Sequence, residues 1–448
     1  MKKNRCVLIS ILVFLCVFGS VYADDSVGEQ LTLQEGITRI IRNNRGVIIA
    51  SIDSDIASQS VVVARSVLLP QINVSASQSF LSYQPGAKFG TLSVYTSERR
   101  YFSYGVDVYQ TLFDFGKNLS VYNAAKSDVD AVKWNAEYVK NQTVLEFILT
   151  YFDLLDAEKM ISVVQKEIDS LTAYLHDIEN LYEQGAAIRS DLLSAKVKRA
   201  DAQQRLITVR NQRGILAARI NNLLAFPLDK KISARDLRVG IPVTLTKSSA
   251  WDIACKQRPE LKIIEARLMG SFYRERAKAK ENLPVLFAEG AYNYMDNQYQ
   301  LRDDNASLQV GVKFPLFDGW RAKGEVVKER AIQSQLFEEQ KKIEEDIRFE
   351  LERDYRDLQD AGEKTTVARD AVSEAAEVVR INKVKYSEGA ANATEVLEAI
   401  AMQAGAETNY TNADYELKRA YARLMYAMGI DLSLVYESME GGGNGTKK

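Results

Sequence analysis

Proline, histidine and cysteine are scarce in this chain of 448 residues, which has 7 Pro, one His and 3 Cys. Scarce proline permits long uninterrupted helices, because proline removes a backbone donor and kinks a helix from within. Scarce cysteine excludes a disulfide-dense scaffold, and 46% hydrophobic residues exclude collagen and bulk disorder. The chain is long enough for two or three average domains.

The chain also lacks a strong net charge of either sign. The 58 Lys and Arg residues nearly balance the 60 Asp and Glu residues. Proteins that bind nucleic acid usually carry a strong positive field on at least one face. We therefore expect no nucleic-acid partner.

Motifs of catalysis are absent from the sequence. It has no GxSxG elbow, no phosphate-binding P-loop and no HExxH helix. His176, the single histidine, has no cysteine near it and is interpreted as a solvated residue on a helix surface. The acidic pairs Asp303-Asp304 and Glu344-Glu345 fit a solvated surface. The sequence predicts no enzyme activity, no metal site and no cofactor.

Residues 1–23 have the three parts of a secretory signal peptide. Basic residues come first, an apolar run extends from Val7 to Phe18, and a small-residue cleavage pattern ends at Ala23. Cleavage there would leave Cys255 as the only cysteine, which we interpret as a buried and inert thiol. No later segment has about 18 consecutive apolar residues, so no spanning helix is expected after cleavage. A membrane β-barrel stays possible, because its strands alternate in polarity.

The two halves of the chain repeat one pattern. Three landmarks recur at an interval of 204 residues (317 − 113, 386 − 182 and 389 − 185): Phe113-Asp114 with Phe317-Asp318, Tyr182 with Tyr386, and Gly185 with Gly389. Self-similarity at a fixed interval indicates a duplicated architecture. Leu69-Pro70 and Leu283-Pro284 are farther apart, which predicts an insertion of about ten residues in a loop of the first half.

Each repeat is predicted to contain a helix, two strands, a very long helix, a glycine turn and a return helix. The first repeat covers residues 24–240 and opens with a helix from about Leu33 to Leu68. The second repeat covers 241–432. The remaining tail, 433–448, is expected to be flexible because it ends in a glycine-rich run.

Two segments in each repeat alternate between apolar and polar residues, which predicts strands with one apolar face. In the second repeat the polar face would carry Ser307, Gln309, Gly311 and Lys313. A soluble sandwich would bury the apolar face, whereas an outer-membrane strand would turn it to lipid. Alternation by itself leaves both possibilities open.

Two proline-free segments, about 116–183 and 319–387, predict helices on the order of 100 Å long at 1.5 Å per residue. In the first, apolar residues alternate in steps of three and four, which is a heptad seam: Ile161, Val164, Ile168, Leu171, Leu175, Ile178 and Tyr182. The second has small and polar residues at the same spacing, which suits a thin-walled assembly with one helix face at water. Return helices over about 190–224 and 394–428 would pack antiparallel against these.

Four strands are too few to close a barrel, which needs about eight or more. In a membrane, the edges of such a sheet must be paired by other copies of the chain. The sequence therefore predicts a homo-oligomer if the strands are in a membrane, and periodicity does not choose between two, three and four subunits.

Several landmarks occur in the order typical of one family. They are Leu31-Thr32-Leu33-Gln34-Glu35 with Asn43-Asn44, Leu68-Leu69-Pro70-Gln71 before the first strand, Phe113-Asp114-Phe115-Gly116 and Phe317-Asp318-Gly319 before the long helices, and two Tyr-x-x-Gly turns. Together they cover nearly all of the mature chain. With them the chain resembles the outer-membrane efflux proteins, the TolC family.

This resemblance implies a fold that combines helical coiled coils with a membrane β-barrel. The expected assembly is a homotrimer with a shared twelve-stranded barrel in outer-membrane lipid and a helical tunnel through the periplasm of a Gram-negative bacterium. The implied function is an export channel of a tripartite efflux pump or type I secretion system. Its implied partners are a periplasmic adapter (membrane fusion) protein and an inner-membrane transporter of the RND, ABC or MFS type.

Two other classes of protein share some of these features. A periplasmic adapter of the membrane-fusion type would have one helical hairpin flanked by β-rich halves, instead of two hairpins each preceded by strands. A secreted coiled-coil structural protein would lack the strand pairs.

The turns of the two helical hairpins are the predicted functional region. Gly185 and Gly389 can adopt positive φ, which ends a helix and reverses the chain. Ser190-Asp191 and Thr394-Glu395 would begin the return helices, where hydroxyl and carboxylate groups cap free N–H groups and match the helix dipole. Capping is a sufficient role for these pairs.

The resemblance adds functional roles at the same turns. It implies that Glu395 and Glu398, three residues apart on one helix face, form acidic rings at the periplasmic entrance. It also implies that Tyr386 and Asp191 tether neighbouring helices in the closed state, with Ser190 as a polar partner. The tips around Gly185, Gly389 and Thr394 would dock the adapter.

One position departs from the family's pattern. The family's tethering arginine corresponds here to Ala391, and the nearest basic residue at a tip is Arg189 in the other repeat. We therefore hypothesise that closure depends on a hydrogen bond from Tyr386 to Asp191, aided by Arg189.

Overall fold

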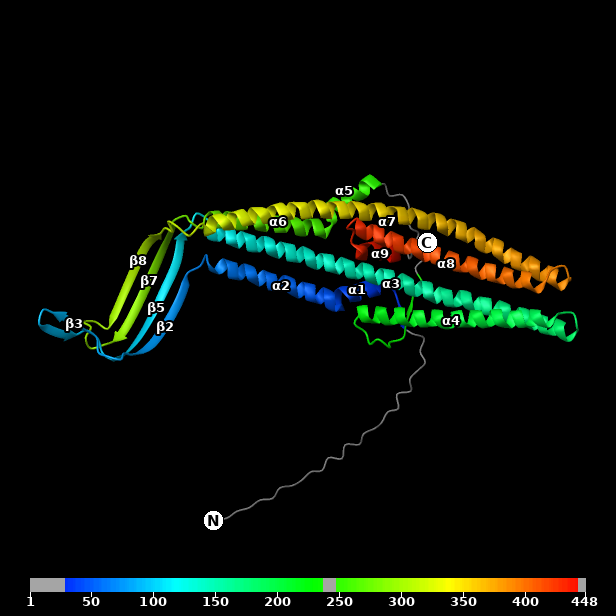
Figure 1. Ribbon diagram of the computed structural model, residues 1–448, viewed down its shortest axis with the longest axis horizontal. Helices are drawn as coiled ribbons and strands as arrows, with labels where there is room; N and C mark the ends of the chain where they lie inside the picture. The colour runs from blue at the N-terminus through cyan, green and yellow to red at the C-terminus, as the bar shows by residue number, and fades with distance from the viewer. Residues whose placement is uncertain (1–28, 237–246, 442–448) are drawn as a thin grey trace, which may run out of the picture.

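The computed structural model describes residues 29–236 and 247–441 and shows a long, narrow molecule (Figure 1). A four-stranded sheet forms one end, and helices form the rest. The elements in chain order are β1 (Glu29–Leu31), α1 (Leu33–Asn43), α2 (Arg45–Ser66), β2 (Gln71–Phe80), β3 (Gly86–Phe89), β4 (Leu92–Tyr95), β5 (Arg100–Phe113), α3 (Lys117–Glu183), α4 (Arg189–Leu223), β6 (Ile232–Ala234), α5 (Lys247–Gln257), α6 (Pro259–Ala279), β7 (Val285–Asp296), β8 (Asp304–Lys313), α7 (Arg321–Ser387), α8 (Ala393–Ala427) and α9 (Leu432–Gly441). The predicted signal peptide and the boundary between the repeats lie outside the described residues.

The sheet has the order β2-β5-β7-β8, and every neighbouring pair is antiparallel. Its register places Val74 opposite Val106, and Val106 opposite Tyr292, so apolar side chains share one face across the strands. The other face is polar, and on it Asn73 donates a hydrogen bond to Asp107 at 2.8 Å. The predicted alternation is therefore confirmed.

No described element covers the apolar face of this sheet (Figure 1). The side chain of Val74 is 75% exposed, and that of Leu308 is 80% exposed. The interior packing that a soluble sandwich would require is missing from the described chain. Both outer strands, β2 and β8, end the sheet with an unpaired edge within this chain.

The predicted insertion in the first repeat lies between β2 and β5. It forms a two-stranded hairpin, β3 with β4, in place of an irregular loop. Gly90 at its turn has a φ of +64°. The hairpin extends beyond the end of the four-stranded sheet (Figure 1).

The two long helices, α3 and α7, have 67 residues each and match the predicted segments closely. The heptad seam of α3 is buried at Val164, Ile168, Leu171, Leu175 and Ile178, as its spacing predicted. Tyr182 at its end is exposed. The return helices α4 and α8 are also as predicted, each beginning within one residue of its expected start.

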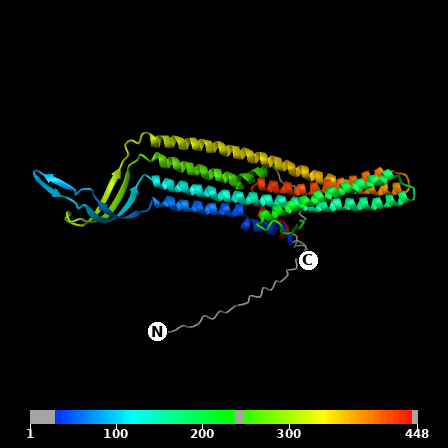
Figure 2. The same ribbon diagram turned by 60° about the horizontal axis from the view of Figure 1, so that its bottom comes forward.

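The helices form one curved layer (Figure 1, Figure 2). Near the sheet, α2 packs on α3, α3 on α6, and α6 on α7. Towards the far end, α4 packs on α3, α3 on α8, and α8 on α7. The edges of the layer are consequently α2 and α4 on one side and α7 along its whole length on the other.

The opening helix predicted over about 33–68 is in fact two helices. Asn44 has an extended backbone, with φ −66° and ψ +129°, and interrupts the run between α1 and α2. Its side-chain oxygen accepts hydrogen bonds from the N–H groups of Gly46 and Val47, and its amide donates to the Leu223 carbonyl at 2.9 Å. An asparagine that caps a new helix explains the break.

By length and composition alone, α2 is apolar enough to cross a membrane, although Asp53 and Asp55 interrupt its apolar run. In the structure it lies along α3, and its outer face exposes Ile49, Ile52, Ile56 and Val63. Its position within the helical layer is the better guide to its role, since one such helix is weak evidence for a spanning segment.

The main hydrophobic core lies midway along the helices. The structure around it differs from two predictions. Residues from Leu432 to Gly441 form α9 instead of a flexible tail, because Leu432 and Tyr436 are buried in this core and the Tyr436 ring lies 6.3 Å from that of Phe152. Residues 442–448 of the predicted tail lie outside the described chain. Cys255 is half-buried and not fully buried, because it lies on α5 at the outer side of α7.

Candidate functional site at the hairpin tips

Both hairpin turns have the geometry that their glycines predicted. Gly185 has a φ of +76° and Gly389 a φ of +74°, values that a residue with a Cβ rarely adopts. The Ala186 N–H donates to the Leu181 carbonyl, and the Ala390 N–H donates to the Lys385 carbonyl, both at 2.8 Å. These hydrogen bonds satisfy carbonyls at the ends of α3 and α7 and close each helix.

The return helices are capped differently from the prediction. The cap of α4 is Ile188, which offers no side-chain acceptor, so Ser190 and Asp191 lie inside the first turn. The cap of α8 is Asn392, whose side-chain oxygen accepts a hydrogen bond from the Glu395 N–H at 3.0 Å. The prediction that Ser190 and Thr394 cap the return helices was therefore wrong, because each helix starts one residue earlier than expected. The carboxylates still lie in the first turn, where they match the helix dipole.

Tyr386 lies near the tip of α7 and faces the first hairpin. Its ring packs edge-on against that of Tyr174 on α3, with 5.5 Å between the ring centroids. Burial, the largest cause, raises the pKa of Tyr386, and the negative charge of nearby Asp191 adds to the rise. The structure brings these two residues together, but no hydrogen bond joins them within the described chain.

Tyr174 is a tip residue that the sequence analysis missed. It is buried, with 2% of its surface exposed, and its hydroxyl donates to the carbonyl of Ala393 at 3.2 Å. This bond connects α3 to the start of α8, while its ring contacts α7. A signal was present in the sequence, since Tyr174 is adjacent to the heptad position Leu175.

Glu395 and Glu398 are both exposed, whereas Val396 and Leu397 between them are buried. The acidic pair therefore projects from one face of α8, as predicted. The same exposed face continues along the helix through Met402, Gly405, Asn409 and Asn412. Neither Glu395 nor Glu398 has an ion-pair partner in the part of the chain that the structure describes.

The remaining predicted tip residues point to solvent or have no close partner. Arg189, Ser190 and Thr394 are exposed, and Ala391 is half-buried. Arg189 forms no ion pair among the described residues, and its predicted aid to closure of the entrance stays a prediction. His176 is exposed, as predicted, and lies 3.4 Å from the amide of Asn180.

A half-buried ionic cluster lies farther from the tips, where α8 packs on α3. Guanidinium nitrogens of Arg419 lie 3.0 Å from Asp153, 3.3 Å from Asp156 and 2.8 Å from Glu416. Burial, the largest cause, raises the pKa of both aspartates despite the adjacent cation. This cluster is a polar connection between the two repeats.

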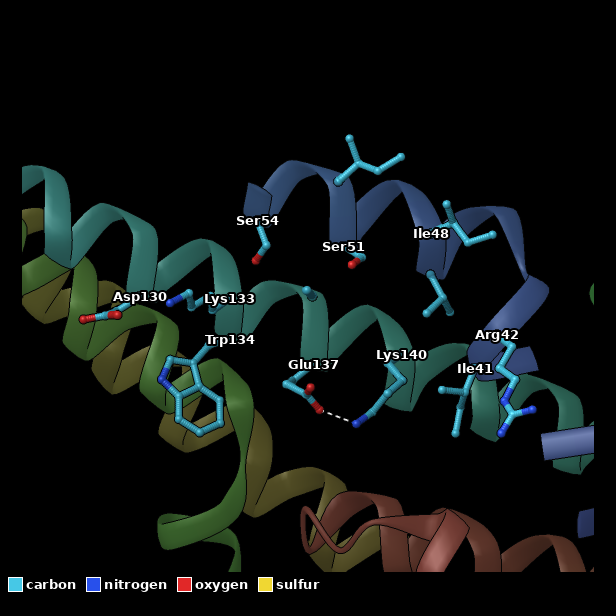
Figure 3. A pocket seen from close by; sticks show the side chains of 13 residues that line it. Ile41, Arg42, Ile48, Ser51, Ser54, Asp130, Lys133, Trp134, Glu137 and Lys140 are labelled. Atoms are coloured by element: carbon cyan, nitrogen blue, oxygen red, sulfur yellow. Dashed lines mark ion pairs between the residues drawn. The ribbon is translucent and has the colours of Figure 1, made fainter. Parts of the chain in front are cut away.

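A groove of about 780 Å³ lies far from the tips, between α2 and α3 (Figure 3). Ser51 and Ser54 of α2 point into it, and α3 contributes Trp134 and the ion pair of Lys140 with Glu137. The groove contains none of the predicted site residues. Among the described residues there is also no group of three or more His, Cys, Asp or Glu arranged to hold a metal.

Comparison with known proteins identifies the family. A sequence profile described as "Outer membrane efflux protein" matches residues 37–225 and 251–430, which is most of the chain. The chain belongs to the outer membrane efflux protein family. The two matched segments correspond to the two repeats found in the sequence.

Individual relatives are distant in sequence but similar along their length. The chain is 21% identical to the outer membrane efflux protein BepC of Brucella suis over 347 residues, covering 77% of this chain and 73% of that protein. It is also 21% identical to nodulation protein T of Rhizobium leguminosarum over 425 residues, covering 91% and 84%.

Solved structures of outer-membrane channels have the same fold. The CmeC outer membrane channel of Campylobacter jejuni superimposes with a TM-score of 0.76 at 16% identity and covers 98% of both chains. The outer membrane protein VceC of Vibrio cholerae gives a TM-score of 0.77 at 14% identity, covering 89% of this chain and 96% of that one. The resemblance inferred from the sequence landmarks is thereby confirmed, and the family is one of channels rather than enzymes.

Proposed function

We propose that this outer membrane efflux protein is the exit duct of a tripartite efflux pump or type I secretion system, working as a homotrimer. The sheet would form one third of a twelve-stranded barrel in outer-membrane lipid, and the helices would form a tunnel through the periplasm. The observation that carries this proposal is the uncovered apolar face of a sheet whose two edge strands are unpaired within the chain.

The strands support a membrane location in two ways. Their exposed apolar face suits lipid, and their polar face suits a water-filled interior. Free strand edges cannot exist within a lipid bilayer, since each unpaired backbone group would cost several kcal/mol. Pairing β2 of one copy with β8 of the next satisfies both edges, and three copies supply twelve strands.

An aromatic cluster at the junction of sheet and helices supports the same location. Phe115, Phe317 and Trp320 are exposed there, in the short segments that enter α3 and α7. Trp320 and Phe317 pack edge-on, with 6.0 Å between their ring centroids. Aromatic side chains commonly collect at the level of the lipid headgroups, which would place the bilayer boundary at this junction.

The helical layer also has edges that suit a closed ring. The outer face of α2 exposes isoleucine and valine side chains, and the opposite edge, α7, exposes Val327, Phe337 and Phe349 at the levels nearer the sheet. Contact between these edges in neighbouring copies would bury both sets. The groove of Figure 3 opens beside α2 and would then border this contact.

At the far end, the acidic pair on α8 would form the entrance. Three copies contribute six carboxylates from Glu395 and Glu398, and rings of carboxylates favour cations in selective channels. The tips around Gly185, Gly389 and Thr394 would meet a periplasmic adapter, which connects the channel to an inner-membrane transporter. Membership of the outer membrane efflux protein family supports this arrangement.

Cation selectivity tests the proposed entrance. We expect Glu395→Gln/Glu398→Gln to lower the cation-to-anion permeability ratio several-fold in planar bilayers, because it removes all six carboxylates without changing side-chain size. Glu388→Gln is the matched control, since Glu388 is exposed at the same tip but lies at the end of α7. Equal ratios for wild type and the double variant would contradict the proposed entrance.

A further inference from the structure

A second groove, of about 920 Å³, runs between α7 and α8 in the half of the molecule that ends at the hairpin tips (Figure 1). Its volume lies within the range of pockets that hold drug-sized ligands. Helix α7 lines this α7–α8 groove with residues between Asp360 and Ala371, and α8 lines it with residues between Met402 and Arg419. Both walls belong to one copy of the chain, so the groove needs no second copy to form.

The α7–α8 groove opens on the same face of the helical layer as the acidic pair at the tip. Exposed residues follow one another along α8 in steps of three and four, which puts them on one face of the helix: Glu395, Glu398, Met402, Gly405, Asn409 and Asn412. Those from Met402 onward line the groove. In the proposed channel the acidic pair faces the interior, so the groove is part of the inner wall.

The short elements at mid-length pack on the opposite face of the layer. Lys418 of α8 lies 3.5 Å from Asp236, which follows β6, whereas Glu416 lines the groove. On α3, the hydroxyl of Tyr151 donates a hydrogen bond to the Leu31 carbonyl of β1 at 2.8 Å. Residues two apart in a helix point about 200° away from each other. The groove therefore lies on the face that β1 and β6 leave open.

The end of the groove nearer the tips is apolar. Val367 is 71% exposed and Met402 is 56% exposed, while Ala406 is buried beneath them. Gly405 lies in the interior of α8, where an added Cβ would meet no described atom within 4 Å. Glycine destabilises a helix interior relative to alanine, and packing within the described chain does not require it at this position. Its missing side chain leaves the groove open.

The end farther from the tips is charged and has one carboxylate in excess. Lys364 pairs with Asp360 at 2.6 Å, and Arg419 pairs with Glu416 at 2.8 Å. Glu363 also lines the groove, is exposed, and has no ion-pair partner in the part of the chain that the structure describes. An apolar wall beside an unpaired carboxylate is complementary to a molecule that carries a positive charge on an apolar body.

We propose that the α7–α8 groove binds amphipathic organic cations on their way through the channel. The apolar body lies against Val367 and Met402, and the cationic group lies at Glu363. The carboxylates of Glu395 and Glu398 at the entrance attract cations, and the groove then holds those that have an apolar body. The inference rests on the proposed channel and deepens it, since it names a class of substrate that the inner wall contacts.

Binding of ethidium, a planar aromatic cation, to the purified full-length protein in detergent tests the groove by fluorescence anisotropy. Fluorescein, a planar aromatic anion, should bind several-fold more weakly. Glu363→Gln should weaken ethidium binding several-fold, because it removes the excess carboxylate with little change in size. Glu345→Gln is the matched control, since Glu345 is exposed on the same face of α7 but lies about five helical turns farther from the tips.

Filling the groove gives a second readout that does not change any charge. Gly405→Leu should weaken ethidium binding several-fold, because the leucine side chain occupies the space between the two helices. Gly362→Leu is the matched control on α7. An added Cβ at Gly362 likewise meets no described atom within 4 Å, and Gly362 does not line the groove. Ethidium binding should therefore be unchanged in this variant.

Native mass spectrometry and bilayer recording of the same samples separate this inference from the channel itself. Conducting trimers that bind no ethidium, or bind it equally well in wild type, Glu363→Gln and Gly405→Leu, would overturn the binding groove and leave the channel standing. Binding that is lost only in Glu395→Gln/Glu398→Gln would place the cation at the entrance and overturn the groove as well. A lower trimer fraction in Gly405→Leu would identify the groove as a contact between copies, which also contradicts the inference. Wild-type protein that forms neither trimers nor channels would overturn the proposed channel.

Discussion

Tyr174 joins three helices at the tip through one side chain. Its ring contacts Tyr386 of α7, and its hydroxyl donates to the first residue of α8. In the proposed closed entrance the second hairpin would stay against the first, and this residue would supply both an apolar contact and a hydrogen bond between them. It also acts within one chain, so it does not require the arginine that Ala391 replaces.

Loss of the Tyr174 hydroxyl should loosen the tip. Tyr174→Phe would remove one of the two donors to the Ala393 carbonyl, which keeps its intrahelical hydrogen bond, at a cost of about 1 kcal/mol. We expect a higher open probability in planar bilayers, and Tyr386→Phe should act in the same direction if its hydroxyl tethers Asp191 in the closed trimer. Tyr182→Phe, at an exposed position of the same seam, is the control. Equal opening rates for wild type and both test variants would refute the tyrosine tether.

Arg419 should matter more at neutral than at acidic pH. Arg419→Met leaves Asp153, Asp156 and Glu416 close together without a cation, which should cost roughly 2 kcal/mol at pH 7, less than for a fully buried pair because Asp153 is 43% exposed. The raised pKa values of the two aspartates mean that their charge destabilises the folded chain above the folded pKa. As the pH falls through the raised pKa values of Asp153 and Asp156, protonation of their carboxylates removes this destabilisation.

The corresponding measurement is the midpoint of thermal unfolding at pH 7 and pH 4. The difference between wild type and Arg419→Met should shrink at pH 4. Arg356→Met, which removes an exposed ion pair with Glu352, should have little effect at either pH. If Arg419→Met lowers the unfolding midpoint equally at both pH values, charge on the three carboxylates is not the cause of the loss of stability.

Among the elements, α8 offers a clear test of how the hairpin turn is held. Asn392→Ala removes the side-chain acceptor for the Glu395 N–H and should cost about 1 kcal/mol of helix stability. Thr394→Ala removes a hydroxyl two residues away that has no capping role in the structure. Hydrogen exchange of the first turn of α8 should therefore accelerate in the first variant only. Equal acceleration of hydrogen exchange in both variants would indicate that Thr394 also caps α8 and would contradict the role given to Asn392.

The regular elements were predictable because each carries a repeated pattern. Period-two alternation identified four strands, the absence of proline identified the two long helices, and the heptad spacing of Val164 to Ile178 identified the buried face of the first. Elements set by single contacts were missed. Asn44 breaks a helix through one side chain, and α9 forms because Leu432 and Tyr436 find a core made by distant segments.

The site was predictable to the same extent. The tip glycines follow from local sequence, and their positive φ agrees with that prediction. Glu395 and Glu398 were chosen because of the family resemblance, and the structure shows that both are exposed on one face of α8. The contribution of Tyr174 depends on three helices meeting, which one-dimensional spacing does not show. Asn392 was missed because the start of α8 was placed one residue too late.

At the scale of the whole molecule, several surfaces of the single chain are exposed that contacts with further copies would bury. The sheet exposes apolar residues and unpaired edges, and the edge helices of the helical layer expose apolar side chains. Family membership decides against the two other classes considered from the sequence, a periplasmic adapter and a secreted coiled-coil protein. The proposed closed ring of chains around a water-filled interior would account for these features.

Single-channel recording of the purified mature protein in planar bilayers tests this account most directly. We predict discrete, small conductance steps from detergent-solubilised trimers, with cations preferred over anions. Protein that stays soluble and monomeric without detergent and gives no conductance steps would contradict the account of the molecule as an outer-membrane channel.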